Sequence, residues 1–366
     1  MSWSREEARL IEASVRRLCA DLAAHPFAQA QTPCSVEAWQ AALQSLVDIG
    51  ILDLSLSSGY ALWQDSKDPD SLQGTLDLLS LLAETNAALA YAAHHIALAQ
   101  QLCINLGAET LALTQGLDLS LGLHGRHGLG RGDLAAWWQG RSLDTRLLED
   151  VWQAQGRRLY LSHAPQALIL SPVFSAGQLG WYAVPSPLWA GGQHGLDELR
   201  LVWVRPDQGD MLGSADAEAM RAFSRQLWQS EWLGLLAIGR GILRAALEQA
   251  TGYAGLRYQG GQIIAGHAAV QILLQEARSA IVESDELLAH ASLDEAGMGR
   301  LLSRRCGLQE RQCAGVDAAL QVLGGSGYMR DVGMEKRFRD IHQLVFQSGS
   351  PLDMQMLAAQ WGNALC

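Results

Sequence analysis

The chain has 366 residues, of which 49% are hydrophobic and 18% charged, so it is expected to fold around a large core in two or three domains. Its net charge of -11 argues against general nucleic-acid binding, which needs a basic face, although a local basic patch is compatible with it. No stretch reaches the roughly 18 uncharged apolar residues of a membrane span. The six cysteines form no CxxC pair, and we expect free thiols in a soluble, cytoplasmic protein.

Three parts follow one another along the chain. Residues 1–117 carry helical periodicity, and the Leu- and Ala-rich stretch 71–106 predicts one long buried helix or two in series. Residues 118–213 are richer in glycine and proline. There the runs "RRLYLSHAP", "ALILSPVF", "GWYAVPSP" and "LRLVWVRP" predict short strands. Residues 214–366 return to long helical patterns joined by short turns, which favour an up-down bundle.

The predicted fold class is therefore mainly α with a central β domain. An N-terminal helical domain (1–117) precedes a small β-barrel or sandwich-like middle domain (118–213) and a C-terminal four-helix bundle (214–366). This order of domains alone defines no function.

The most informative segment is "LQVLGGSGYMRDVGMEKRFRDIHQLVFQSGSP", residues 320–351. Its glycine pair ends an apolar helical pattern, which permits a left-handed cap and exposes backbone N–H groups. A simple helix stop is the plainest interpretation. The pair does not match a dinucleotide fingerprint, which needs GxGxxG directly after a strand.

Two segments resemble signatures of the acyl-CoA dehydrogenase family. The first matches the family's C-terminal signature at Gln321, Gly324, Gly325, Gly327, Tyr328, Glu335, Arg339 and Asp340. The second, "YAGLRYQGGQIIAGHAAVQ", resembles the family's arginine motif at Arg257, Gln259, Gly261, Ile263 and His267. The resemblance is strong over 214–366, fair over the N-terminal helices and weak over the β domain.

The resemblance implies an FAD enzyme whose cofactor lies between the β domain and the bundle and is held partly by a neighbouring subunit. It assigns the pyrophosphate to Arg257, within a motif that includes Gln259 and His267. It assigns the adenine end to Gln321, Gly324 and Gly325. An arginine fork and exposed glycine backbone suit a dinucleotide. The alternative for Arg257 is a surface charge near a helix end.

Two serines complete the cofactor residues that the resemblance implies. Ser350 stands where the family has an FAD-contacting threonine. Ser162 in "LYLSHAPQA" matches a family hydroxyl that touches the flavin ring, although Tyr160 and His163 replace the usual Trp and Asn. A plain β-strand is the alternative interpretation for Ser162.

The family removes an α-proton of an acyl-CoA thioester while flavin N5 takes a hydride from the β-carbon. Many members place the base, a glutamate, in a turn that here reads Ser348-Gly349, where we expect substrate contacts instead. A minority place it on the first long bundle helix, and that position falls on Glu231 in "QSEWLGLLAIG". We expect burial to raise the Glu231 pKa. The alternative is a first-turn glutamate serving the helix dipole. Trp232 stands where the family often has arginine.

The resemblance further implies a bulky, branched or long acyl group, an electron-transfer flavoprotein or other electron acceptor, and a homo- or hetero-oligomer, dimeric or tetrameric. The missing turn glutamate and the divergent β domain leave a second interpretation open. In it the chain is a catalytically silent partner that completes a neighbour's FAD site, as in the family's mixed oligomers acting on sterol side chains. A related flavoenzyme with another substrate is a third.

Other histidines give weaker signals. His124 and His127 in "HGRHG" lack carboxylates or cysteines at ligand spacing, so a polar loop is expected there and no metal. Of His94 and His95, one is expected to be buried and the other exposed, without function.

Overall fold

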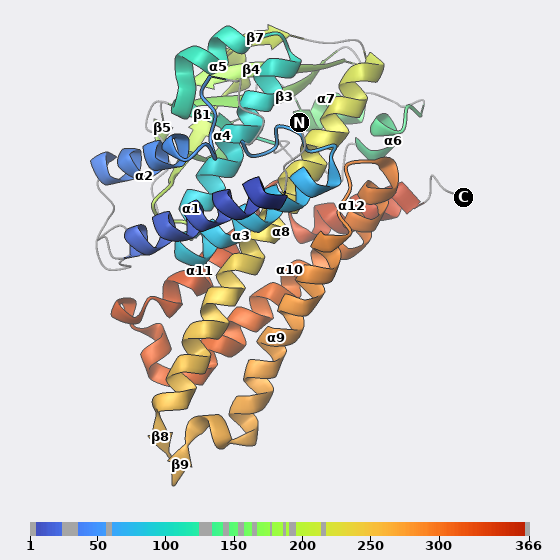
Figure 1. The fold of residues 1–366 in the computed structure, drawn as a ribbon. Helices are drawn as coiled ribbons and strands as arrows, with labels where there is room; N and C mark the ends of the chain where they lie inside the picture. Colours follow the sequence, from blue (N-terminus) through green and yellow to red (C-terminus); the bar gives the residue numbers. More distant parts are fainter. Residues whose placement is uncertain are drawn as a thin grey trace.

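The computed structural model describes residues 5–23, 36–55, 61–123, 134–141, 146–152, 157–162, 167–175, 178–185, 188–189, 195–213 and 217–362. His124, His127 and His163 lie outside these ranges. In Figure 1 the strands of residues 118–213 gather at the upper end of the molecule, and long helices run below them. The order of helices, strands and helices that the sequence predicts is confirmed. The domain limits themselves stay a prediction.

The N-terminal part is helical, as predicted. The stretch 71–106 forms two helices rather than one, because Asn86 ends the first and begins the second. Its extended backbone breaks the helix, and its side chain accepts a hydrogen bond from the Leu89 N–H at 2.8 Å. The elements are α1 (Arg5–Ala23), α2 (Val36–Asp48), α3 (Pro69–Thr85), α4 (Ala87–Asn105), α5 (Glu109–Gln115) and the 3-10 turn η2 (Gly116–Asp118).

The middle part contains two small sheets. One has the order β1-β3-β4-β7 and the other β2-β6-β5. Each of the four apolar runs singled out in the sequence contains one strand, which confirms those predictions. The elements are β1 (Leu119–Leu121), α6 (Leu134–Trp138), α7 (Arg146–Trp152), β2 (Arg158–Ser162), β3 (Leu168–Ser175), β4 (Gln178–Pro185), β5 (Leu188–Trp189), β6 (Arg200–Val204), η3 (Pro206–Gln208) and β7 (Asp210–Gly213).

The C-terminal part is built on α8, a helix of 40 residues that crosses the whole molecule (Figure 1). It begins at Ala217, well before the apolar run, so Glu231 lies in the helix interior and the first-turn interpretation of this residue is wrong. The elements are α8 (Ala217–Leu256), β8 (Tyr258–Gln259), β9 (Gln262–Ile263), η4 (Ile264–Gly266), α9 (Ala268–Ala289), α10 (Glu295–Leu323), η5 (Gly324–Tyr328), η6 (Arg330–Val332), α11 (Met334–Leu344) and α12 (Pro351–Gly362).

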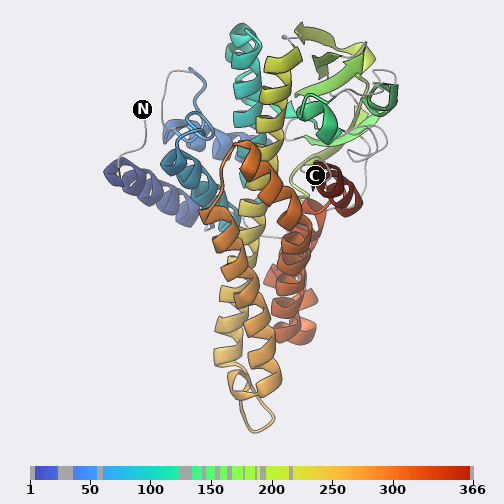
Figure 2. The ribbon, with the colours of Figure 1, turned by 90° about the vertical axis from the view of Figure 1, so that its right-hand side faces the viewer.

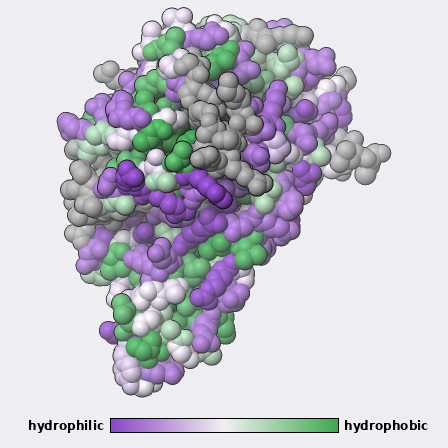
Figure 3. All heavy atoms as spheres, in the orientation of Figure 1, coloured by the Kyte–Doolittle hydropathy of each residue, from purple (hydrophilic) through white to green (hydrophobic). Residues whose placement is uncertain are grey.

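The glycine pair ends α10, as predicted. Gly324 caps the helix with φ 56°, a conformation that suits glycine. At the lower end of the molecule, β8 and β9 form a hairpin that joins α8 to α9 and projects below the rest of the chain (Figure 2). Apolar residues are visible on this tip in Figure 3, where Leu256 and Tyr258 are exposed. No helix in the described ranges is long and apolar enough to cross a membrane.

One continuous core joins the N-terminal helices to the bundle. The contact of α3 with α8 is close, because a Cβ at Gly241 would lie 2.1 Å from the Ser80 main-chain oxygen. Beside it, the buried Arg240 guanidinium donates to Ser80, Asp77 and Asp285 and so connects α3, α8 and α9. This packing sets α3 and α4 against the middle of α8.

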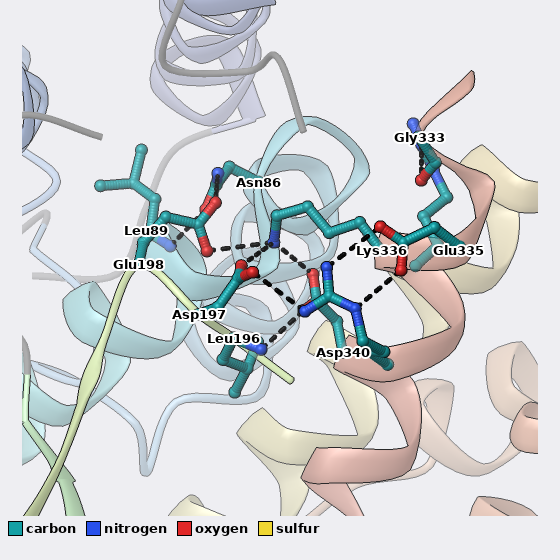
Figure 4. A network of polar contacts seen from close by, with 11 residues as sticks. Asn86, Leu89, Leu196, Asp197, Glu198, Gly333, Glu335, Lys336 and Asp340 are labelled. Atoms are coloured by element: carbon teal, nitrogen blue, oxygen red, sulfur yellow. Dashed lines mark hydrogen bonds and ion pairs between the residues drawn. The ribbon is translucent and has the colours of Figure 1, made fainter. Parts of the chain in front are cut away.

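A buried ion network fastens α11 to the segment that precedes β6 (Figure 4). Lys336 Nζ lies 2.7 Å from Asp340 Oδ2 and 3.0 Å from Glu198 Oε2. Asp340 also accepts the Leu196 N–H at 2.6 Å, and Asn86 donates to Glu198 at 2.7 Å. Although burial alone would lower the Lys336 pKa, the carboxylates of Asp340 and Glu198 raise it, so the lysine is charged.

Replacing Lys336 with methionine is expected to lower the free energy of unfolding by about 3–5 kcal/mol, because two buried carboxylates would lose their shared cation. Urea unfolding measures this change. The matched control is Arg205→Met, which removes an exposed pair with Asp207 and should cost less than about 1 kcal/mol. Equal losses in the two variants would contradict the structural role of the network.

Candidate active site around Glu231

Glu231 is the centre of a buried polar cluster between α8, α4 and the turn at 347–349. Its side chain is 0% exposed. Oε1 accepts the Ser348 hydroxyl at 2.5 Å and lies 3.2 Å from His95 Nε2. Oε2 lies 2.9 Å from His94 Nε2. The two positions that the sequence offered for a catalytic carboxylate, Glu231 and Ser348, therefore meet in one place.

The turn that carries Ser348 is held from three sides. Ser348 has φ 52°, a left-handed conformation that is costly for a residue with a Cβ. Its main-chain oxygen accepts the Trp232 indole N–H at 2.8 Å. Arg305 donates to the Gln347 main-chain oxygen at 3.0 Å, and Tyr91 donates to the Gln347 side chain at 3.2 Å. These contacts fix the strained backbone and aim the serine hydroxyl at the carboxylate.

Fixed partners define where the protons of the two histidines lie. The Trp63 indole can only donate, and its Nε1 lies 2.9 Å from His94 Nδ1, so that nitrogen is an acceptor and the His94 proton is on Nε2. The Leu121 carbonyl can only accept, and it lies 3.0 Å from His95 Nδ1, so His95 carries a proton on Nδ1. Both rings face Glu231 with Nε2, and the fixed partners place a proton on that nitrogen in His94 but on the opposite nitrogen in His95.

The carboxylate oxygens differ in their surroundings. The His94 ring N–H also lies 3.3 Å from the Glu231 main-chain oxygen. Oε2 lies within ion-pair distance of His94 Nε2, but it accepts no hydrogen bond of suitable geometry from the described residues. Oε1 has two partners. Oε2 is thus the oxygen with a free lone pair.

The expected rise of the Glu231 pKa is wrong. Burial raises it, but the His95 and His94 imidazoles outweigh burial and hold the pKa well below its usual range. Burial lowers the His94 pKa, which agrees with its neutral tautomer, and lowers the Arg305 pKa to about 9. Burial together with the Glu231 charge raises the Tyr91 pKa. The cluster holds an ionised carboxylate in a dry setting.

The ligand atoms of His94, His95 and Glu231 all lie within 4.8 Å of one another, as in a metal site. The protonation of His94 argues against a metal. A ligating imidazole needs a lone pair on the ligand nitrogen and donates its other N–H to an acceptor. The Trp63 N–H occupies that other nitrogen instead, so His94 Nε2 keeps its proton.

Tryptophans pack beside the cluster on the side of the β strands. Trp228 of α8 contacts the rings of Trp138, Trp152 and Trp181 with centroid distances of 5.7–6.0 Å. Trp232 lies 6.1 Å from Trp138, and all of these rings are buried. These tryptophans are packing residues. Their apolar surface lowers the local dielectric and strengthens the charges around Glu231.

The residues assigned to the FAD adenine and pyrophosphate lie far from Glu231. Leu256, the last residue of α8, is twenty-five positions beyond Glu231, roughly 38 Å along the helix. Arg257 and Gln259 follow it and are exposed at the tip of the bundle. His267 is half-buried, and its Nε2 holds the hairpin by donating to the Gln259 carbonyl at 2.9 Å. A single extended dinucleotide does not reach from Glu231 to this tip.

The tip nevertheless has features that fit a dinucleotide. Among the described residues, no carboxylate pairs with Arg257, so its guanidinium is available to a phosphate. Gly324 and Gly325, at the end of α10, have open space where a Cβ would stand, and Gln321 is exposed. A dinucleotide held by these groups would therefore not be the one that contacts this chain's own Glu231.

The two remaining serines have structural partners. Ser350 caps α12, since its hydroxyl donates to Asp353 at 2.7 Å and accepts the Asp353 N–H at 3.2 Å. Ser162 is the last residue of β2, is fully buried and pairs with Arg200 of β6. Gly349 is buried next to Ser348 with φ 121°. Only Ser348, of the residues assigned to cofactor or substrate, contacts Glu231.

Sequence reasoning missed most of the cluster. His94 and His95 are both buried, so the expectation that one is exposed is wrong. Two adjacent histidines in an alanine-rich helix were the available signal, because nearly every residue of α4 is buried and both rings converge on Glu231. Trp63 and Arg305 gave no signal, since their partners are distant in the sequence.

Comparison with known proteins agrees with the fold and with the C-terminal motifs. Residues 226–351 match the family model "Acyl-CoA dehydrogenase, C-terminal domain". The chain is 27% identical over 174 residues to a probable acyl-CoA dehydrogenase of Bacillus subtilis, YngJ, which covers 44% of this chain and 43% of that protein. It is 34% identical over 112 residues to another B. subtilis acyl-CoA dehydrogenase, with 30% of each chain covered. The matches thus span less than half of these relatives.

The whole fold is similar to that of a solved enzyme. Glutaryl-CoA dehydrogenase from Mycobacterium smegmatis superposes with a TM-score of 0.73 at 16% identity, over 99% of this chain and 95% of that one. Residues 226–351 are thus similar to the C-terminal domain of acyl-CoA dehydrogenases, and the fold of the whole chain is similar to that of a solved acyl-CoA dehydrogenase.

Substitutions at Ser348 separate its hydrogen bond from its strained backbone. Ser348→Ala removes the donor to Glu231 and is expected to lower the free energy of unfolding by about 1–3 kcal/mol. Ser348→Gly removes the same donor but relieves the positive φ, so it should be more stable than the alanine variant by about 1 kcal/mol. Urea unfolding of both variants measures the difference. An alanine variant as stable as the glycine variant would show that the backbone is not strained.

Proposed function

We propose that the chain is an FAD-dependent acyl-CoA dehydrogenase in which Glu231 removes the α-proton of the substrate. The observation that supports this most directly is the 2.5 Å contact between Glu231 and Ser348. In the family that the chain resembles, the catalytic carboxylate comes from one or the other of these two positions. Glu231 therefore brings a carboxylate to the place where the turn lacks one.

The chain's own groups would prepare Glu231 for this step. Ser348 and His95 hold Oε1, and Oε2 keeps the lone pair that takes the proton. The α C–H electron pair becomes the new C=C bond, and the β-hydrogen leaves with its electron pair. FAD, when bound, supplies the acceptor for that hydride. The surrounding aromatic residues exclude water from the carboxylate.

We place the FAD contacts in two groups. Ser162 and Ser350 would contact the flavin of this chain, and Ser348 and Gly349 would contact the substrate beside Glu231. Arg257, Gln259, His267, Gln321, Gly324 and Gly325 would hold the pyrophosphate and adenine of a neighbouring subunit's FAD. The length of α8 supports this division, and it requires an oligomer. A bulky or branched acyl group is the finer proposal, which rests on the helix position of the base.

The burial of Glu231 favours a second candidate function, a catalytically silent partner subunit. A pocket of about 300 Å³ is lined by Trp63, Leu98 and Ser230. Trp63 contacts His94, and His94 contacts the Glu231 carboxylate, so these two side chains separate the pocket from the carboxylate. The tip residues, in contrast, are exposed. A chain with a closed site and an open tip would complete a neighbour's FAD site without reacting itself.

The visible spectrum of the purified chain under acyl-CoA addition distinguishes the two functions. The dehydrogenase proposal predicts a bound flavin that bleaches without oxygen when an acyl-CoA of suitable chain is added. Glu231→Gln should slow bleaching by about 10²–10⁴-fold. The exposed Glu276→Gln on α9 is the control and should bleach at the rate of the unmodified protein. A colourless protein, or one whose flavin never responds, would favour the silent partner.

The role of Arg257 is tested by flavin affinity. Arg257→Ala is expected to weaken FAD binding by about 10- to 100-fold, because a charge-assisted hydrogen bond to a phosphate contributes about 1.5–3 kcal/mol. Fluorescence titration of FAD into the deflavinated oligomer measures the Kd. The exposed Arg9→Ala on α1 serves as a charge-matched control. Unchanged affinity in the Arg257 variant would remove this residue from the cofactor site.

A further inference from the structure

His95 occupies an unusual position beside Glu231. Its Nδ1 proton is fixed on the Leu121 carbonyl of β1, and its Nε2 faces Glu231 Oε1 at 3.2 Å. The ring also stacks on Tyr91, with centroids 4.1 Å apart, so it has no room to turn over. The ring orientation is therefore defined by contacts on both edges and one face.

An unprotonated Nε2 in this position would face an oxygen lone pair of an ionised carboxylate, which is repulsive. A proton must therefore lie between the two atoms. His94 cannot supply this proton, because its Nε2–H is directed at the main-chain oxygen and Oε2 of Glu231. The Ser348 hydroxyl already donates to Oε1 from another direction. The remaining proton belongs to the pair His95–Glu231.

We propose that His95 is a positioning residue that carries this proton as an imidazolium, holds Glu231 Oε1 and leaves Oε2 as the atom that accepts the substrate α-proton. The inference rests on the proposed function for the role of Oε2. The protonation state of His95 is independent of that function. His94 differs in being neutral, which makes the two adjacent histidines chemically distinct.

The charges around the pair are consistent with one positive imidazole. From α4, His94 is neutral and Tyr91 is un-ionised because burial raises its pKa. From α10, the Arg305 guanidinium stacks over Trp232 at 5.2 Å and donates to Gln347. Burial lowers its pKa and the Glu231 charge raises it, so Arg305 is a nearby cation that makes no hydrogen bond to the carboxylate among the described contacts. Glu231 is the acidic residue of the cluster, and His95 is its directly bonded cation.

The first test is nitrogen NMR of the protein labelled with ¹⁵N-histidine. At about pH 7 the inference predicts protons on both ring nitrogens of His95 and on Nε2 alone of His94. The His95 signals are those lost in His95→Gln. If that variant does not fold, His94→Gln removes the other buried ring and leaves His95 to be identified. In Glu231→Gln, His95 should become neutral with its proton on Nδ1.

A His95 that is neutral in the unmodified protein, or unchanged in Glu231→Gln, would overturn the inference whether or not the protein reacts with acyl-CoA. This measurement needs no activity. A colourless or unresponsive protein would instead contradict the proposed function and leave the protonation result standing. The two failures are therefore distinguishable.

The second test is the pH profile of flavin bleaching. Loss of the imidazolium in His95→Gln removes the charge that favours ionised Glu231, so the acid limb should move up by about 1–3 pH units. His94→Gln removes no charge and keeps an N–H donor in reach of Glu231, so it should move the limb less than His95→Gln does. A purely structural role for His95 would lower the rate at every pH without moving the limb, and that result would contradict the inference.

Discussion

The structure around the candidate site depends on one interaction, the burial of an ionised Glu231 against His95. A carboxylate inside an apolar core is costly unless a cation and hydrogen-bond donors offset the loss of water. Here the cation comes from α4, the hydroxyl from the 347–349 turn and the carboxylate from α8. Three segments distant in the sequence are thereby held together. The strained φ of Ser348 persists because Trp232 and Arg305 hold the same turn.

In the proposed assignment the catalytic carboxylate lies on the helix instead of the turn, and the serine of the turn donates to it. The network of Lys336, Glu198 and Asp340 keeps α11 against the segment that precedes β6. A long helix, α8, then separates the carboxylate from the exposed tip by roughly 38 Å, which divides the cofactor contacts between subunits in the proposed oligomer.

The sequence predicted those features that depend on local patterns. Short apolar runs between turn residues located the strands of the middle part. The apolar run after Glu231 indicated that this residue is buried. The glycine at 324 marked the end of α10. What could not be predicted comes from contacts across the chain. His95 and Glu231 are 136 residues apart, and Ser348 and Glu231 are 117 apart. Without those neighbours, burial alone predicts a raised Glu231 pKa, which the histidines reverse.

Exchange of the acyl-CoA α-hydrogen with D₂O tests most directly whether Glu231 is a base, because it needs no electron acceptor. The holoenzyme would be incubated with a panel of acyl-CoAs without oxygen, and deuterium at the α-carbon would be measured by mass spectrometry. The account predicts deuterium uptake in the unmodified protein and none above background in Glu231→Gln. Uptake that is the same in both proteins, or absent from both, would contradict the assignment of Glu231 as the base.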